Sequence, residues 1–104
     1  MSLDSIKIPG DIVTVDGTRE QYTKIFMFAI STCMWCKRGK RWLEENGYSY
    51  SYLDIDKLDV KVKDKLKADI KGVFGVRPRF PFVVINNTEW NSGYNPDVWK
   101  EMIR

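Results

Sequence analysis

KIFMFAISTCMWCKRGKRWLEENG, residues 24–47, is the stretch of sequence that decides the fold. It opens with a continuous apolar run, residues 24–30, which has the length of one β-strand. Apolar side chains on both faces are typical of a strand in the middle of an α/β sheet. Ser31 or Thr32 can then cap a helix that begins near Cys33. This stretch therefore predicts a buried strand that passes directly into a helix.

Further strands and helices are predicted on both sides of this stretch from hydrophobic periodicity and turn residues. Strands are predicted at 12–15, 48–55, 82–85 and 89–90, and a last helix at 95–103. Between the strands at 48–55 and 82–85, an amphipathic helix is predicted, with a solvated lysine face and an apolar stripe formed by Leu58, Val62, Leu66 and Ile70. A strand–helix–strand unit is parallel and right-handed, whereas strands joined by a turn run antiparallel. The order predicts an α/β fold: a mixed four-stranded sheet, extended by an added N-terminal strand and flanked by three helices.

The composition is typical of one globular domain. The chain has 104 residues, 43% of them hydrophobic, and a net charge of +3, which is too small a basic excess to indicate nucleic-acid binding. No apolar run approaches the roughly 20 residues of a membrane span, and residues 1–20 are unlike a signal peptide. We therefore expect a cytoplasmic protein with no membrane partner. Residues 21–104 are expected to form the domain, with residues 1–20 as an N-terminal extension.

The two cysteines of the chain, Cys33 and Cys36, lie three positions apart at the predicted strand–helix junction. Positions three apart share one helix face, roughly 5–6 Å apart, which is within the Cα separation that a disulfide tolerates. The helix N-terminus and the following Lys37 and Arg38 favour the thiolate of Cys33, the nucleophilic form. Cys36 lies one turn further in and can displace whatever Cys33 captures. The pair therefore predicts a dithiol–disulfide oxidoreductase.

Two other interpretations of the cysteine pair stay open at this point. Free cysteines are often small, inert core residues. A zinc site needs about four nitrogen or sulfur ligands, and this chain has two cysteines and no histidine. The strand before the pair and the helix after it favour redox chemistry, and we expect no metal site.

Four motifs in order, FAISTCMWCKRGKRWLEENG, YSYLDID, RFPFVVIN and EWNSGYNPDVW, resemble those of glutaredoxins. The resemblance covers about residues 24–103 and implies the thioredoxin fold. Within the family, the chain looks closest to small archaeal and bacterial glutaredoxin-like proteins and to the redoxins that donate electrons to ribonucleotide reductase.

The resemblance implies roles for residues beyond the cysteines. Pro81 matches a cis-proline that packs beside the active-site disulfide, and Phe80 before it offers backbone groups to a substrate; an ordinary strand-start proline is the alternative. Gly93 and Tyr94 match a turn that binds a small thiol's carboxylate, with a plain loop as the alternative. Arg77 precedes this strand and can hold a carboxylate, since arginine suits bidentate pairing, or can be a solvated surface residue.

The chain also departs from the pattern of glutathione-using members. Met34 and Trp35 replace proline and tyrosine between the cysteines, Ile30 replaces a lysine, and Ser92 replaces the first residue of a double glycine. Each difference weakens a specific claim for glutathione. Trp35 is expected to pack over the disulfide or to present an apolar docking face to the substrate, with ordinary packing on the helix surface as the alternative. Residues 24–30 contain no buried carboxylate, which distinguishes the chain from thioredoxins proper.

The resemblance also implies partners and electron sources. No bound cofactor is expected, and the reductant is glutathione, another small thiol or a flavoprotein reductase. Expected partners are small thiols and disulfide-containing proteins, with ribonucleotide reductase as one candidate, for a monomeric enzyme. The second hypothesis is a binding module in which two chains each offer Cys33 to a bridging iron–sulfur cluster.

Overall fold

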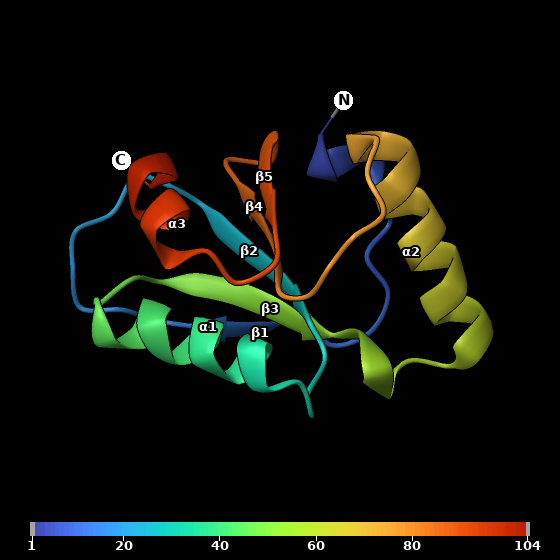
Figure 1. Ribbon diagram of the computed structural model, residues 1–104, viewed down its shortest axis with the longest axis horizontal. Helices are drawn as coiled ribbons and strands as arrows, with labels where there is room; N and C mark the ends of the chain where they lie inside the picture. The colour runs from blue at the N-terminus through green and yellow to red at the C-terminus, as the bar shows by residue number, and fades with distance from the viewer. Residues whose placement is uncertain (1, 104) are drawn as a thin grey trace.

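The computed structural model describes residues 2–103, which contain five strands, three α-helices and two short 3-10 helices (Figure 1). In chain order the elements are η1 (Leu3–Ser5), β1 (Val13–Val15), β2 (Ile25–Ala29), α1 (Met34–Glu45), β3 (Tyr50–Asp54), η2 (Ile55–Lys57), α2 (Val60–Phe74), β4 (Phe82–Ile85), β5 (Glu89–Ser92) and α3 (Pro96–Met102). Every strand and α-helix predicted from the sequence is present in the predicted order.

The five strands form one mixed sheet in the order β1-β3-β2-β4-β5. The central strand β2 pairs in parallel with β3, and the other neighbours are antiparallel. All residues of β2 are buried, as expected for a strand covered on both faces. β1 adds an edge strand beside β3. The predicted α/β architecture is confirmed, with the added N-terminal strand as the fifth strand of the sheet.

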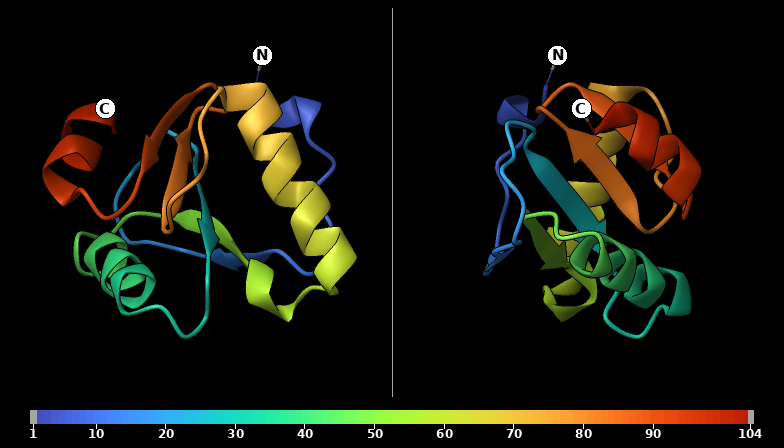
Figure 2. Two further views of the ribbon diagram at one scale, coloured as in Figure 1. Left: turned by 45° about the vertical axis from the view of Figure 1, so that its right-hand side comes forward. Right: turned by 90° about the vertical axis from the view of Figure 1, so that its left-hand side faces the viewer.

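Helices cover the sheet on both sides and form two cores (Figures 1 and 2). On one face, Met27 of β2 belongs to the same buried cluster as Leu43 of α1 and Trp99 of α3. On the other face, Phe28 of β2 clusters with Leu66 of α2. Removing these side chains from water is the main driving force for folding. Because α1 packs on β2, the loop between them is held at the end of the central strand.

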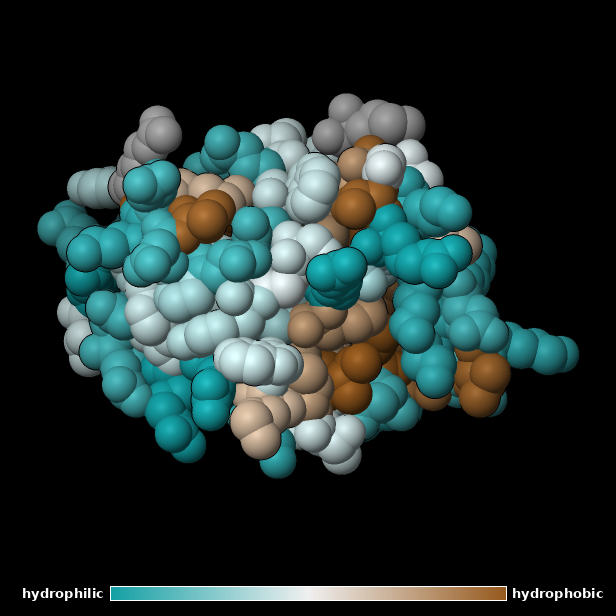
Figure 3. All heavy atoms as spheres, in the orientation of Figure 1, coloured by the Kyte–Doolittle hydropathy of each residue, from teal (hydrophilic) through white to brown (hydrophobic). Residues whose placement is uncertain are grey.

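The apolar stripe predicted for α2 is correct only in its second half. Leu66 and Ile70 are buried, whereas Val62 is 38% exposed and Leu58 lies before the helix, at the end of η2. Asp59 caps the helix by accepting a hydrogen bond from a backbone N–H of its first turn. Figure 1 shows this first turn standing furthest from the sheet, which explains its exposure. Hydrophilic residues cover much of α2 in Figure 3, as predicted for its lysine face.

The N-terminal segment contributes to the second core as well as to the sheet. Leu3 and Ile6 are buried in the cluster that contains Phe28. The backbone N–H of Leu3 also donates to the carbonyl of Asn87, after β4, at 2.6 Å. Within residues 2–103, none of the helices combines the length and apolar character needed to cross a membrane.

Candidate active site

Cys33 is the N-cap residue of α1 rather than its first helical residue. Its backbone is extended, with φ −78° and ψ 123°, and its Sγ accepts a hydrogen bond from the Cys36 backbone N–H at 3.4 Å. The cysteine sulfur thus takes the place of the hydroxyl oxygen that usually caps a helix. The prediction that Ser31 or Thr32 caps the helix is wrong, because the helix begins one residue too late for Thr32 and two residues too late for Ser31.

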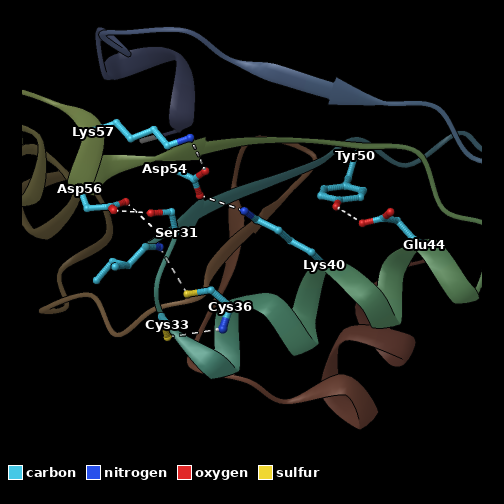
Figure 4. Close-up of polar contacts among 10 residues, drawn as sticks. Ser31, Cys33, Cys36, Lys40, Glu44, Tyr50, Asp54, Asp56 and Lys57 are labelled. Atoms are coloured by element: carbon cyan, nitrogen blue, oxygen red, sulfur yellow. Dashed lines mark hydrogen bonds and ion pairs between the residues drawn. The ribbon is translucent and has the colours of Figure 1, made fainter.

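Ser31 instead ties the loop before α1 to the segment after β3. Its backbone N–H donates to Asp56 Oδ1 at 2.8 Å, and its hydroxyl donates to Asp56 Oδ2 (Figure 4). These two hydrogen bonds, the hydroxyl's first, lower the pKa of the Asp56 carboxyl below its usual value. The Ile30 carbonyl accepts a hydrogen bond from the Cys33 N–H at 3.0 Å. The loop that carries Cys33 is therefore held by contacts on both sides.

Burial distinguishes the two thiols. Cys33 is half-buried, Cys36 is fully buried, and both are free cysteines. The Cys36 Sγ accepts a hydrogen bond from the Ile30 backbone N–H at 3.4 Å. Loss of hydration raises the pKa of the Cys36 thiol to about 12, although the Ile30 N–H and the charge of Lys40 act in the opposite direction. The structure thus presents one accessible sulfur and keeps the other as a buried thiol.

The Phe80–Pro81 peptide bond is cis, as the resemblance implied. Pro81 is buried and lies close to α1 at Gly39, while Phe80 is half-buried between the two cores. Gly93 adopts φ +92° and donates its N–H to the Pro81 carbonyl at 3.0 Å. This left-handed conformation favours glycine. The turn after β5 is therefore hydrogen-bonded directly to the proline strand.

Trp35 of α1 and Tyr94, in the turn between β5 and α3, form an aromatic contact. Their rings stack with centroids 5.6 Å apart and an interplanar angle of 30°. The Arg38 guanidinium lies 4.9 Å from the centre of the Trp35 ring. Tyr94 also meets the buried Trp99 edge-on. Trp35 remains half exposed, so the stack forms a partly solvent-facing surface. Trp35 lies two residues after Cys33, on the helix that Cys33 caps.

A charged pair, Lys40 of α1 and Asp54 of β3, connects the helix that carries Cys36 to the sheet. Lys40 Nζ is 2.9 Å from Asp54 Oδ1 and 3.9 Å from the centre of the Tyr52 ring. Lys57 approaches the other carboxylate oxygen, Asp54 Oδ2, at 3.7 Å (Figure 4). The side chains of Lys40 and Asp54 are only 18% and 9% exposed.

A family model described as Glutaredoxin matches residues 22–90, which include both cysteines and Pro81. This chain belongs to the glutaredoxin family. It is a thiol–disulfide oxidoreductase, in agreement with the activity predicted from the cysteine pair. A comparison with curated protein sequences gave no match.

Solved structures of other redoxins share the fold of this glutaredoxin. A glutaredoxin from Archaeoglobus fulgidus is 30% identical, with a TM-score of 0.68 over 85% of this chain and 99% of that chain. The methanoredoxin of Methanosarcina acetivorans is 26% identical, with a TM-score of 0.66 over 77% and 83%. The NrdH-redoxin of Escherichia coli, at 22% identity and a TM-score of 0.58 over 78% and 96%, shows the fold alone. The thioredoxin fold of the glutaredoxin is thus confirmed.

Three further residues that were predicted for the site are basic: Lys37, Arg38 and Arg77. The side chains of Lys37 and Arg77 are exposed, and Arg38 lies over Trp35. Their predicted roles, in stabilising the thiolate or binding substrate, stay predictions.

Two polar pairs near the site, Lys40–Asp54 and Ser31–Asp56, were not predicted from the sequence. The four-residue spacing from Cys36 to Lys40 indicated that these two side chains share one helix face, but the sequence did not indicate Asp54 as the partner of Lys40.

Across residues 2–103, no three His, Cys, Asp or Glu side chains gather in a way that could hold a metal ion. The iron–sulfur hypothesis requires ligands from a second chain and from small thiols, and it stays a prediction.

Proposed function

We propose that this glutaredoxin reduces disulfides of proteins and small molecules, with Cys33 as the attacking residue and Cys36 as the resolving residue. The observation that carries the proposal is the contrast between the two sulfurs. A half-buried Cys33 caps α1, and a fully buried Cys36 lies one turn behind it. The partial positive charge at a helix N-terminus favours an anion, and here the cap itself is the sulfur.

The first step captures the substrate. The Cys33 thiolate attacks one sulfur of a substrate disulfide, a mixed disulfide with Cys33 forms, and the other substrate sulfur leaves as a thiolate and takes up a proton. Pro81, which follows the cis peptide bond, lies close to α1 at Gly39, and Gly93 donates a hydrogen bond to the Pro81 carbonyl. We assign Phe80, Pro81 and Gly93 to substrate positioning, and the surface formed by Trp35 and Tyr94 to contact with the substrate.

The second step releases the product. Cys36 Sγ attacks Cys33 Sγ, the bond from Cys33 to the substrate breaks, and the substrate sulfur leaves as a second thiolate that takes up the proton lost by Cys36. Two electrons pass from the two cysteines to the substrate, and the enzyme is left with a Cys33–Cys36 disulfide. An external small thiol or flavoprotein reductase then restores the two thiols. We propose disulfide-containing proteins as substrates, with ribonucleotide reductase as a candidate drawn from the family resemblance.

The proposal is tested with single cysteine variants and a protein disulfide as substrate. Cys33→Ser should reduce the rate to that of the uncatalysed reaction, because Cys36 is buried. Cys36→Ser should still form a mixed disulfide with the substrate, detectable by its mass, but should not release the product without added thiol. A Cys33→Ser variant that retains the wild-type rate would show that the assignment is wrong.

The electron source needs a separate measurement. The oxidised enzyme is mixed with glutathione, with other small thiols or with a flavoprotein reductase, and the rate at which its disulfide is reduced is compared. We expect one class of reductant to be clearly faster than the rest. If Cys36→Ser still turns over small-molecule mixed disulfides, then a small thiol reduces the mixed disulfide on Cys33 directly. Such a result would assign a one-cysteine route to small thiols.

A further inference from the structure

Lys40 is a cation on the same face of α1 as the buried thiol. It follows Cys36 by four residues, and side chains at this spacing are neighbours on a helix, about 5–6 Å apart at Cβ. Figure 4 shows both side chains leaving α1 on the side that faces β3. Lysine is seldom buried without a partner, and this side chain is only 18% exposed.

Asp54 and Tyr52 hold the ammonium group of Lys40 in place. The Asp54 carboxylate is 2.9 Å away, and the Tyr52 ring lies beneath the ammonium at 3.9 Å. A surface lysine loses several rotamers when it is fixed in this way, so the contacts must compensate for that loss. By contrast Lys57, on the outer side of the same carboxylate, is 71% exposed and lies further away at 3.7 Å. Lys40 is thus the inner, fixed cation of this cluster.

The resolving step places negative charge where water is excluded. Cys36 must lose its proton to attack, yet burial favours its neutral thiol, as the raised pKa shows. The Ile30 N–H is one group that favours the anion, through its hydrogen bond to Cys36 Sγ. The positive charge of Lys40 also favours the anion. No buried carboxylate lies in β2, since its sequence is IFMFA.

We propose that Lys40, positioned by Asp54, stabilises the negative charge that develops on Cys36 Sγ and so accelerates the resolving step. This inference depends on the proposed function, in which Cys36 displaces the substrate from Cys33. No additional reactant is required, because the proton of Cys36 passes to the departing substrate thiolate or, where that thiolate is weakly basic, to water.

The expected size of the effect follows from two opposing trends. A nearby opposite charge shifts a pKa by about 1–3 units. Because the Lys40 charge is the weakest of the effects that act on the Cys36 pKa, we take the lower part of that range, and loss of the charge then reduces the thiolate fraction at neutral pH by about tenfold to a hundredfold. The thiolate of a thiol with a higher pKa is intrinsically more nucleophilic, with a Brønsted coefficient of about 0.4–0.5. On a logarithmic scale, this gain compensates roughly half of the fall in rate caused by the smaller thiolate fraction. Loss of the Lys40 charge should therefore slow resolution by about threefold to tenfold.

A chromogenic aromatic disulfide separates the two steps in one experiment. The reduced enzyme is mixed with this substrate in a stopped-flow instrument, and one coloured thiolate is released when Cys33 attacks. A second is released when Cys36 resolves the mixed disulfide. In a Cys36→Ser variant only the first phase should occur, which assigns the phases. Absence of a first phase in the wild type would contradict the proposed function itself, whereas the inference about Lys40 concerns the second phase alone.

Lys40→Gln should slow the second phase by about threefold to tenfold and leave the first phase within about twofold of the wild type. Lys40→Arg, which keeps the charge, should retain a second phase within about twofold. The matched control is Lys65→Gln, which removes a lysine from an exposed Lys–Asp pair of the same 2.9 Å length on α2 and should change neither phase. Far-ultraviolet circular dichroism verifies that each variant is folded.

A folded Lys40→Gln variant with a wild-type second phase would overturn the inference, and so would equal slowing of both phases. If Lys40→Gln fails to fold because Asp54 loses its partner, the double variant Lys40→Gln/Asp54→Asn keeps an amide pair in place of the ions. The same criteria then apply to its two phases. A folded Lys40→Arg variant as slow as Lys40→Gln would show that charge is not the cause.

Discussion

At the scale of single residues, the two thiols differ in how strongly they interact with water. Cys33 uses its sulfur as a helix cap at the surface, while the Cys36 sulfur accepts a hydrogen bond from the Ile30 N–H in the interior. A buried thiol without charge is compatible with this interior, but a buried thiolate is costly. The chemistry proposed for the pair therefore depends on the few groups that surround Cys36.

The raised pKa of Cys36 predicts a specific loss of stability in alkali. Above about pH 9 an unfolded thiol loses its proton, whereas folded Cys36 keeps it until about pH 12. The unfolded state then binds fewer protons, so stability falls as pH rises through this window. Between about pH 8 and pH 10.5, Cys33→Ser should lose about 2 kcal/mol more in free energy of unfolding than Cys33→Ser/Cys36→Ser, as measured by urea denaturation.

The serine at position 36 is the control in this comparison, because it cannot titrate in that range. All other ionisable groups are the same in both proteins, including Tyr50, whose pKa is also raised by burial and by its hydrogen bond to Glu44. Parallel pH profiles for the two variants would contradict the environment described for Cys36.

At the scale of elements, α1 packs closely on its neighbours because it contains a glycine. A Cβ at Gly39 would lie 2.9 Å from the Trp99 ring and 3.4 Å from Pro81 Cγ. Trp99 is fully buried, and its Nε1 donates to Asn91 Oδ1 at 3.1 Å, so the ring has little room to move. The missing side chain thus lets the active-site helix approach both α3 and the cis-proline strand.

Gly39→Ala should destabilise the protein by about 1–2 kcal/mol, since overpacking outweighs the helix propensity gained. Gly72→Ala is the matched control: a methyl group on this α2 glycine would have no atom within 4 Å, so the substitution should stabilise by up to about 1 kcal/mol. Thermal unfolding of both variants provides the comparison, and a stabilised Gly39→Ala variant would contradict the packing argument.

At the scale of the whole molecule, the N-terminal segment is part of the fold. Leu3 and Ile6 fill the core on the α2 side of the sheet, and β1 extends the sheet at its edge. We propose that the redox chemistry belongs to residues 21–104 and that the N-terminal extension completes the hydrophobic core on the α2 side of the sheet through Leu3 and Ile6. The extension then acts on stability and not on the chemical steps.

Leu3→Ala and Ile6→Ala should each lower the free energy of unfolding by about 2–3 kcal/mol, because each leaves a cavity in the core. The rates of both phases of the disulfide reaction should stay within about twofold while the protein is folded. Ile12→Ala removes a side chain that is 47% exposed and should cost less than about 1 kcal/mol. Equal effects of all three substitutions in chemical denaturation would show that the extension does not complete the core.

The order of strands and helices could be predicted because each depends on residues that are neighbours in the chain. The apolar run of β2 and the Cys33–Cys36 spacing are examples, and the cis bond at Pro81 followed from the family resemblance. The helix cap was predicted wrongly because serine and threonine are better caps than cysteine on average, while the observed cap depends on where the loop is anchored by Asp56.

By itself, then, the sequence determined the fold class, the family and the position of the two thiols at a strand–helix junction. Only the tertiary structure decided that Lys40 meets Asp54, that Trp35 stacks on Tyr94 and that Leu3 is in the core. The physical reason is that hydrophobic periodicity specifies which face of an element is buried, but not which distant side chain it meets there. Those partners are selected when the whole chain packs.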